Sequence, residues 1–184
     1  MKISHVILAV ALASAAGSSF AFKLSSTDIS PAKPVANKFV FKGFGCDGEN
    51  ISPALSWSGA PKDTKSFALL VHDPDAPTGG SGWWHWGVFN LPATTTALAQ
   101  GAGKGDGSAL PKGAGQIKTD FGSEGYGGPC PPQGDKPHRY IFSLHALRSE
   151  KLDIPAGSTA ALAGFMINAN TISKATLTVK FGRK

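Results

Sequence analysis

Glycine and proline interrupt this chain at short intervals, and that restricts its fold more than any other feature. The 184 residues include 23 glycines and 13 prolines, which lie mostly in clusters between short apolar runs. Runs bounded in this way are typical of strands joined by shaped loops. The candidate strands are 39–41, 55–57, 67–71, 84–90, 140–147 and 177–181. The sequence therefore predicts a mostly β domain.

Two strands and one helix can be interpreted in more detail. Residues 67–71 are apolar at every position, which predicts a strand buried on both faces. The run 177–181 alternates apolar and polar residues, so one of its faces is expected in solvent. After Pro155, Ser158 can cap a helix near the C-terminus. The apolar stripe of this helix is expected at Leu162, Phe165, Met166, Ala169 and Ile172.

The first 21 residues have the pattern of a cleavable secretory signal peptide. Lys2 supplies a positive charge, an apolar run covers residues 6–16, and small residues lead to Ala21. A transmembrane helix needs about 20 apolar residues, so we expect no transmembrane anchor. Residues 22–184 would then form a single domain, which is periplasmic or secreted.

The charge distribution argues against nucleic acid as a partner. The formal net charge is +6 at pH 7, but the lysines are scattered and form no basic run. Nucleic-acid-binding proteins concentrate their positive charge in a patch or stripe. A modest positive balance is compatible with small anionic ligands.

Cys46 and Cys130 are the two cysteines of the sequence. In an oxidising compartment an even pair of cysteines favours a disulfide bond. A zinc site would need two further ligands, and no Cys-x-x-Cys motif is present to begin one. We therefore expect a disulfide between Cys46 and Cys130, and no metal site.

Three segments place polar side chains at strand ends beside loop-forming residues. Asp73 and Asp75 follow the buried strand in a proline-bounded turn, His85 lies among tryptophans, and His138 and Tyr140 begin a strand after a proline-rich loop. Imidazole, phenol and carboxylate groups can build a polar pocket. Each segment also has a purely structural interpretation, as a capped turn, a hydrogen-bonded core histidine or a core tyrosine.

Together these segments resemble the phosphatidylethanolamine-binding protein (PEBP) family, also called the Raf-kinase-inhibitor-like proteins, and in particular its bacterial exported branch. The matching strings are DPDAP at 73–77, WHWGVFNLP at 84–92 and GPCPPQGDKPHRYIFSLHAL at 128–147. The string CDGENISPALSW at 46–57 is similar to the N-terminal signature of the bacterial branch. The likeness runs in order from about residue 38 to the end.

The resemblance implies a PEBP-like β-sandwich, with a large antiparallel sheet, a smaller sheet and a C-terminal helix. It also implies a small surface pocket for phosphate or a phosphorylated head group, without a cofactor. Matched by motif, the ligand-binding residues would be Asp73, Asp75, Pro77, Trp83, His85, Gly128, Pro129, His138 and Tyr140. The Cys46–Cys130 bridge would then lie beside this pocket.

The function expected from the resemblance is binding of a small anion rather than catalysis, with a kinase or protease as a protein partner to be modulated. The alternative is a metal-dependent or acid/base hydrolase that uses Asp73, Asp75, His85 and His138. A third alternative, a lipid carrier at the membrane surface, has no amphipathic anchor in the sequence to favour it. Because an ordinary histidine titrates near pH 6.5, anion affinity is expected to rise as the pH falls from about 8 to 6.

Overall fold

Antiparallel sheets account for most of the regular structure in the computed structural model, which describes residues 21–184. The larger sheet has five strands, in the order β10 (Thr171–Phe181), β9 (His138–Leu147), β5 (Ser66–Asp73), β6 (Trp83–Pro92) and β8 (Gly115–Gln116). The smaller sheet has three strands, in the order β1 (Lys23–Ser25), β4 (Leu55–Ser58) and β7 (Ala97–Leu98). The remaining elements are the hairpin β2 (Lys42–Gly43) and β3 (Cys46–Asp47), the 3₁₀ helix η1 (Asn37–Phe39) and the helix α1 (Ala160–Asn170).

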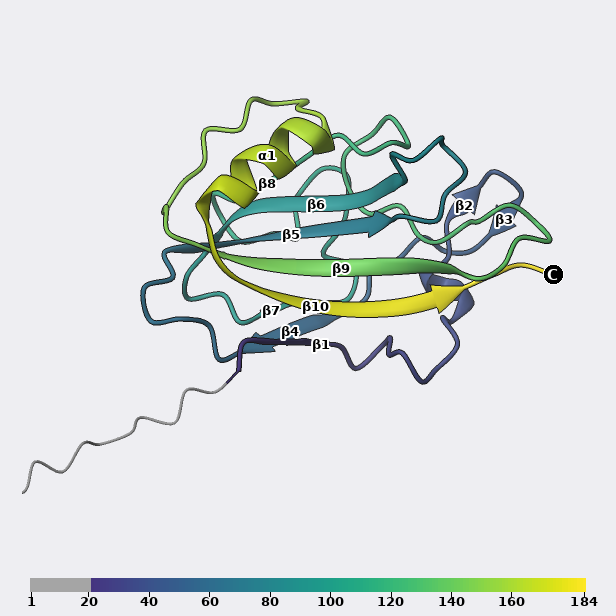
Figure 1. The fold of residues 1–184 in the computed structure, drawn as a ribbon, viewed down its shortest axis with the longest axis horizontal. Coiled ribbons are helices and arrows are strands. Elements are labelled where there is room, and N and C mark those ends of the chain that lie inside the picture. Colours follow the sequence, from purple (N-terminus) through teal and green to yellow (C-terminus); the bar gives the residue numbers. More distant parts are fainter. Residues whose placement is uncertain (1–20) are drawn as a thin grey trace, which may run out of the picture.

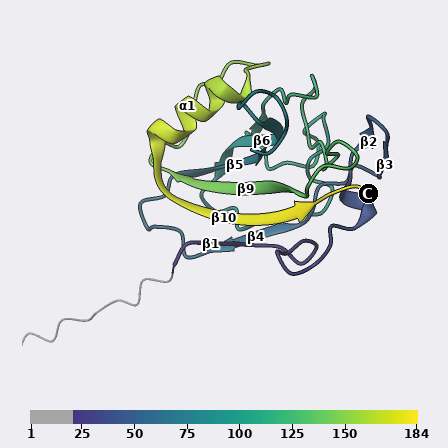
Figure 2. The ribbon, with the colours of Figure 1, turned by 45° about the vertical axis from the view of Figure 1, so that its right-hand side comes forward.

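The elements form three layers, with the five-stranded sheet in the middle. Helix α1 lies over one face of this sheet and the strands β1 and β4 lie beneath the other, as Figures 1 and 2 show from two directions. The sequence prediction of a mostly β sandwich with a large antiparallel sheet, a smaller sheet and a C-terminal helix is confirmed.

Strand β5 shows why the sheet needs cover on both faces. Phe67, Leu69 and Val71 join the core between the two sheets, while Ala68 and Leu70 belong to the second core beneath α1. Successive side chains of a strand point to opposite faces, so a strand without polar positions must be covered twice. The prediction that 67–71 is buried on both faces is confirmed.

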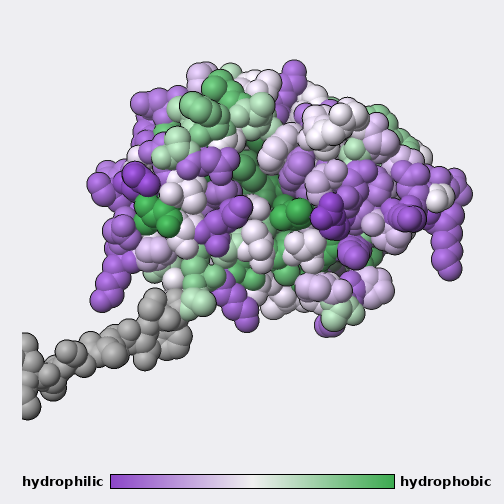
Figure 3. All heavy atoms as spheres, viewed as in Figure 1, coloured by the Kyte–Doolittle hydropathy of each residue, from purple (hydrophilic) through white to green (hydrophobic). Residues whose placement is uncertain are grey.

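The apolar stripe predicted for the C-terminal helix is mostly wrong, since of its members in the helix only Met166 packs against the core. Small side chains bring α1 against the sheet, and its buried residues are Ala160, Ala163, Gly164 and Ile167. Leu162 and Phe165 instead face solvent, with 44% and 73% of their surface exposed. The hydrophobic (green) area at the upper left of Figure 3 lies over this helix. The residue that caps the helix is Thr159 rather than Ser158, because the Thr159 hydroxyl accepts a hydrogen bond from the Leu162 amide.

The predicted strand at 39–41 is also wrong. Residues Asn37–Phe39 form η1, and the extended residues after it bond to loops instead of to a sheet. The Phe41 amide donates to the Pro129 carbonyl, and the Asn50 amide donates to the Val40 carbonyl. These bonds attach the N-terminal part of the domain to the proline-rich loop, residues 127–137.

Residues 1–20 lie outside the described part of the chain, so the expectation of a signal peptide over residues 1–21 stays a prediction. Across residues 21–184, no helix combines the length and the apolar character that crossing a membrane requires.

Candidate functional site

A pocket of about 220 Å³ opens at one end of the five-stranded sheet. Because neighbouring strands are antiparallel, β5 ends at this edge while β6 and β9 begin there. The strand ends bring together side chains from three distant parts of the sequence. Five of the nine predicted ligand-binding residues line the pocket, namely Asp73, Pro77, Trp83, His85 and Tyr140.

His85 reaches the pocket because strand β6 carries an extra residue at that point. Val71 of β5 pairs with Trp86, but the next residue, His72, pairs with Trp84, so His85 is left opposite no residue of β5. Such a β-bulge changes the direction in which a side chain points. In a regular strand His85 would share a face with Gly87 and Phe89. The bulge is the reason why it does not.

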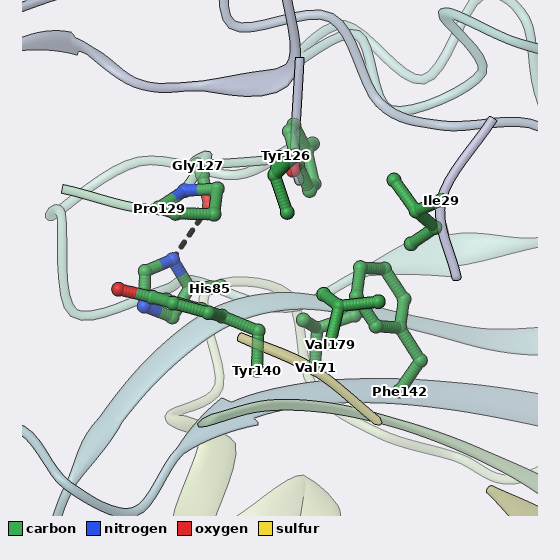
Figure 4. A pocket seen from close by; sticks show the side chains of 10 residues that line it. Ile29, Val71, His85, Tyr126, Gly127, Pro129, Tyr140, Phe142 and Val179 are labelled. Atoms are coloured by element: carbon green, nitrogen blue, oxygen red, sulfur yellow. Dashed lines mark hydrogen bonds between the residues drawn. The ribbon is translucent and has the colours of Figure 1, made fainter. Parts of the chain in front are cut away.

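One side of the His85 ring is bonded to the protein backbone. Its Nδ1 lies 2.7 Å from the Gly127 carbonyl oxygen, the bond drawn as a dashed line in Figure 4. A carbonyl oxygen can only accept, so Nδ1 carries the proton and the neutral ring has a free lone pair on Nε2. Burial lowers the pKa of His85 from its ordinary 6.5 to about 4, although the Gly127 carbonyl acts in the opposite direction. The pH window of 8 to 6 expected from an ordinary histidine therefore does not apply to His85.

Tyr140 and Trp83 supply hydrogen-bond donors that have no partner. The Tyr140 hydroxyl and the Trp83 indole nitrogen are both buried and make no hydrogen bond within residues 21–184. Burial, followed by the nearby charge of Asp73, raises the pKa of Tyr140 above its ordinary value, so the hydroxyl keeps its proton. Buried polar groups are usually paired. Two unpaired donors beside one pocket therefore indicate a place where a ligand could accept hydrogen bonds.

Asp73 lines the pocket, but its oxygens are already bonded. One oxygen accepts from the Asp75 amide at 2.8 Å, and the other accepts from His138 Nδ1 at the same distance. Asp73 and His138 are both almost completely buried. This carboxylate therefore positions the turn and the His138 ring, and it also gives the pocket a negative charge.

His138 and Asp75 face a different cavity. On its other side the His138 ring lies 3.5 Å from Asp135, and the guanidinium of Arg139 makes a two-pronged ion pair with Asp75. The Arg139 side chain is the main reason that the pKa of Asp75 falls to about 2. These residues border a shallow surface hollow of about 450 Å³, called the ion-paired hollow below, which is separate from the pocket.

The two remaining predicted residues, Gly128 and Pro129, lie behind the pocket. The Gly128 amide already donates to the Asn50 side chain at 2.7 Å. A Cβ atom at Gly128 would lie 2.2 Å from the Phe39 carbonyl oxygen, so glycine is required here by close packing. Pro129 lines a hollow of about 10 Å³ on the inner side of His85 and Tyr140, shown in Figure 4. Its other walls are apolar, and it has room for about one water molecule at most.

The outer lip of the pocket is formed by two aromatic rings that the sequence motifs did not predict. Phe44 lies at the tip of the β2–β3 hairpin with 69% of its surface exposed, and it stacks on Phe121 with ring centroids 6.0 Å apart. Both rings line the pocket. The predicted disulfide between Cys46 and Cys130 is present, and it attaches this hairpin to the proline-rich loop. Because the two rings come from separate loops, no local sequence signal could have joined them.

No metal centre is formed by the described residues. Within residues 21–184, no group of three His, Cys, Asp or Glu side chains comes close enough to hold a metal ion. The four residues of the hydrolase alternative also separate, with Asp73 and His85 in the pocket and Asp75 and His138 in the ion-paired hollow.

Comparisons with known proteins agree on one family. The family model described as phosphatidylethanolamine-binding protein matches residues 25–182. The protein YbcL of Escherichia coli K12 is 50% identical over 178 residues, which cover 97% of both chains. The crystal structure of E. coli YbcL, described as a new member of the mammalian PEBP family, has a TM-score of 0.86 at 52% identity, with 89% of this chain and 99% of that chain covered.

A second solved structure is more distant. It is a putative PEBP homolog, CT736, from Chlamydia trachomatis, with a TM-score of 0.74 at 32% identity, and the match covers 89% of this chain and 99% of that chain. The fold and the match over nearly the whole domain give the same answer: this chain belongs to the phosphatidylethanolamine-binding protein family.

Proposed function

We propose that this chain is an exported binding protein that holds a small phosphoryl-bearing molecule in the pocket at the end of the five-stranded sheet. The observation that carries the proposal is a set of polar atoms in the side chains that line the pocket. The Tyr140 hydroxyl and the Trp83 indole nitrogen make no hydrogen bond within residues 21–184, and Nε2 of His85 is the second nitrogen of a ring that is bonded through Nδ1. A tetrahedral phosphoryl group has several oxygens that can meet donors from different sides.

The size of the pocket supports a head group rather than a whole lipid. Its volume of about 220 Å³ lies below the roughly 300–1,000 Å³ of pockets that bury drug-sized ligands. The hollow on the inner side holds at most about one water molecule, so it gives an acyl chain no continuation. This favours phosphate, phosphoethanolamine or a similar small compound over a lipid with its tails.

Binding fits the positions of the side chains better than hydrolysis does. The hydrolase alternative needs Asp73, Asp75, His85 and His138 around one substrate. Asp75 is instead paired with Arg139, and both nitrogens of His138 face carboxylates. Asp73 and His85 alone would have to supply the acid, the base and the nucleophile.

Export is supported by the disulfide, since such bonds persist in oxidising compartments. The signal pattern in residues 1–21 agrees with it. A kinase or protease partner stays a prediction from the family resemblance.

Calorimetry with inorganic phosphate and phosphoethanolamine at pH 6 tests the proposal. Tyr140→Phe removes one pocket donor and keeps the ring, so affinity should fall about 10- to 100-fold, since a hydrogen bond to a charged group contributes about 1.5–3 kcal/mol. Trp57→Phe is the matched control, because the Trp57 indole nitrogen is also buried and makes no hydrogen bond among the described residues, but it lies in β4, outside the pocket lining. Absence of binding at millimolar concentration, or binding lost only when Arg139 is replaced, would overturn the proposal.

A further inference from the structure

We infer that the pocket selects oxyanions that carry a proton, because the ligand must donate a hydrogen bond to Nε2 of His85. A phosphoryl group with a P–OH satisfies this requirement, whereas sulfate and sulfate esters have no proton to give at neutral pH. The inference rests on the proposed function and concerns the same pocket. It makes His85 the residue that determines specificity between two anions of nearly identical shape.

The orientation of the His85 ring is fixed by a reciprocal pair of hydrogen bonds. The Gly127 amide donates to the His85 carbonyl at 2.8 Å, and His85 Nδ1 donates to the Gly127 carbonyl at 2.7 Å. Rotation of the ring by 180° would break the second bond and leave a buried carbonyl without a partner. The ring also packs edge to face against Tyr140 and Phe121, with centroids 5.0 and 5.3 Å away. Nε2 is therefore held as an acceptor.

The surroundings of His85 do not supply a positive charge. Asp73 on β5 is the charged group that lines the pocket with it, and Tyr140 on β9 is a neutral phenol. His72, also on β5, makes protonation of His85 harder, while Asp73 and the backbone of Gly127 and Gly128 make it easier. Burial is the largest effect and lowers the pKa of His85 to about 4. Among the described residues, no lysine or arginine lines this pocket.

The pocket therefore combines one acceptor with two donors beside a carboxylate. A protonated phosphoryl group matches this set, because its P–OH donates to His85 while other oxygens accept from Tyr140 and Trp83. A fully deprotonated anion would place an oxygen against the lone pair of Nε2 and near the charge of Asp73. A site built around one hydrogen bond strongly rejects the analogue that cannot make it, so we expect discrimination of at least tenfold.

The experiment compares phosphoethanolamine with 2-aminoethyl sulfate, which has the same shape and the same ammonium group. Affinities are measured by calorimetry between pH 5.5 and 8 at constant ionic strength, with inorganic phosphate and inorganic sulfate as a second pair. Phosphoethanolamine should weaken about tenfold per pH unit above the second ionisation of its phosphate, near pH 6. Inorganic phosphate keeps a proton through neutrality and should continue to bind. The two sulfate compounds should bind at least tenfold more weakly than their phosphate counterparts at pH 5.5.

Equal affinity for phosphate and sulfate compounds would overturn this inference and leave the proposed function in place. Absence of binding by all four compounds would overturn both. His85→Gln offers an amide that can rotate to donate, so this variant should bind sulfate about as well as phosphate and lose the pH dependence.

A second measurement does not need the variant to fold. Nitrogen-15 NMR of the histidine rings in the unaltered protein should find the His85 proton on Nδ1 at pH 7, with Nε2 unprotonated. A proton on Nε2 at that pH, or a charged ring, would contradict the inference.

Discussion

The pocket, lined by Asp73, and the ion-paired hollow, lined by its partner His138, differ in how their polar groups are hydrogen-bonded. The hollow contains more charge, but its Asp75 carboxylate is bonded to Arg139 and its His138 ring lies between two carboxylates. The pocket contains little charge, and two donors of its lining residues, the Tyr140 hydroxyl and the Trp83 indole nitrogen, make no hydrogen bond within residues 21–184. Missing partners indicate a binding site better than an accumulation of charged residues does.

The comparison also explains why both histidines of the motifs looked equivalent in the sequence. His85 and His138 are almost fully buried, and each is held through Nδ1 by an oxygen atom. For His85 the oxygen is a carbonyl, and the far nitrogen has no hydrogen-bond partner among residues 21–184. For His138 it is a carboxylate, and the far nitrogen faces Asp135. One ring is therefore available to a ligand, while the other joins the pocket wall to the hollow.

Removal of the disulfide should have the largest effect on stability, and it should change the pocket rather than the ion-paired hollow. The bond closes a sequence separation of 84 residues, which corresponds to about 4–5 kcal/mol in the chain-entropy model. The double variant Cys46→Ser/Cys130→Ser should lose stability on that scale in urea denaturation. Phosphate affinity should fall as well, because the β2–β3 hairpin is no longer attached to the proline-rich loop and Phe44 no longer keeps its place at the lip of the pocket. A loss below about 1 kcal/mol would contradict this account, and reduced wild-type protein serves as a control.

Mild acid should produce the next largest effect, through His85. Its pKa is 6.5 in the unfolded chain and about 4 in the folded protein, so between these values the unfolded chain binds more protons. The free energy of unfolding should therefore fall as the pH drops from about 6.5 to 4, by up to about 3 kcal/mol. Urea denaturation at pH 7, 5.5 and 4 measures this loss. His85→Gln should show a smaller loss than wild type, and parallel curves for the two proteins would rule out a role for His85.

His145 is the necessary comparison for that experiment. Burial lowers its pKa to about 4 as well, and its Nδ1 bonds to the Thr171 hydroxyl, away from the pocket. His145→Gln should reduce the acid sensitivity without changing phosphate affinity. This separates the stability effect of a buried histidine from its effect on a ligand.

The smallest effect is expected from the ion-paired hollow. Arg139 is half exposed, and exposed ion pairs contribute little to stability because solvent screens them. Arg139→Ala should lower the melting temperature by less than about 4 °C and leave phosphate affinity unchanged. Because the pKa of Asp75 is about 2, the contribution of the pair is present above about pH 4 and disappears as the pH falls through 2. A large loss of phosphate affinity in Arg139→Ala would indicate that phosphate binds in the ion-paired hollow instead of the pocket.

Much of the fold could be predicted because its signals are local. The apolar run at 67–71 has no polar position, so it had to be a strand covered on both faces, and β5 is one. The face of helix α1 was not predictable in the same way. Leu162 and Phe165 have the larger apolar surface, but Ala163 and Gly164 allow the closer approach of helix and sheet. Either the stripe of large residues or the stripe of small residues could face the sheet. The small residues do so, because they allow a shorter distance between helix and sheet.

The candidate site could be predicted only in part, because its members depend on partners far along the chain. Asp73, Pro77, Trp83, His85 and Tyr140 were predicted as pocket residues through the family resemblance, which the motifs at the strand ends carry. His138 lies outside the pocket lining, because its ring is bonded to carboxylates, one of which is Asp73, 65 positions away in the sequence. The Gly128 amide already donates to the Asn50 side chain. Such hydrogen bonds depend on the tertiary fold, so the spacing of residues within a local motif does not predict them.

The bulge at His85 has a consequence for how homologous sequences are aligned. Deletion of one residue from this strand would restore regular pairing with β5, and the imidazole would then be carried to the opposite side of the sheet or lost. A homologue with a gap at this position could keep every tryptophan of the motif and still have no acceptor in its pocket. Strand length here is therefore as informative about ligand choice as the identity of any single amino acid.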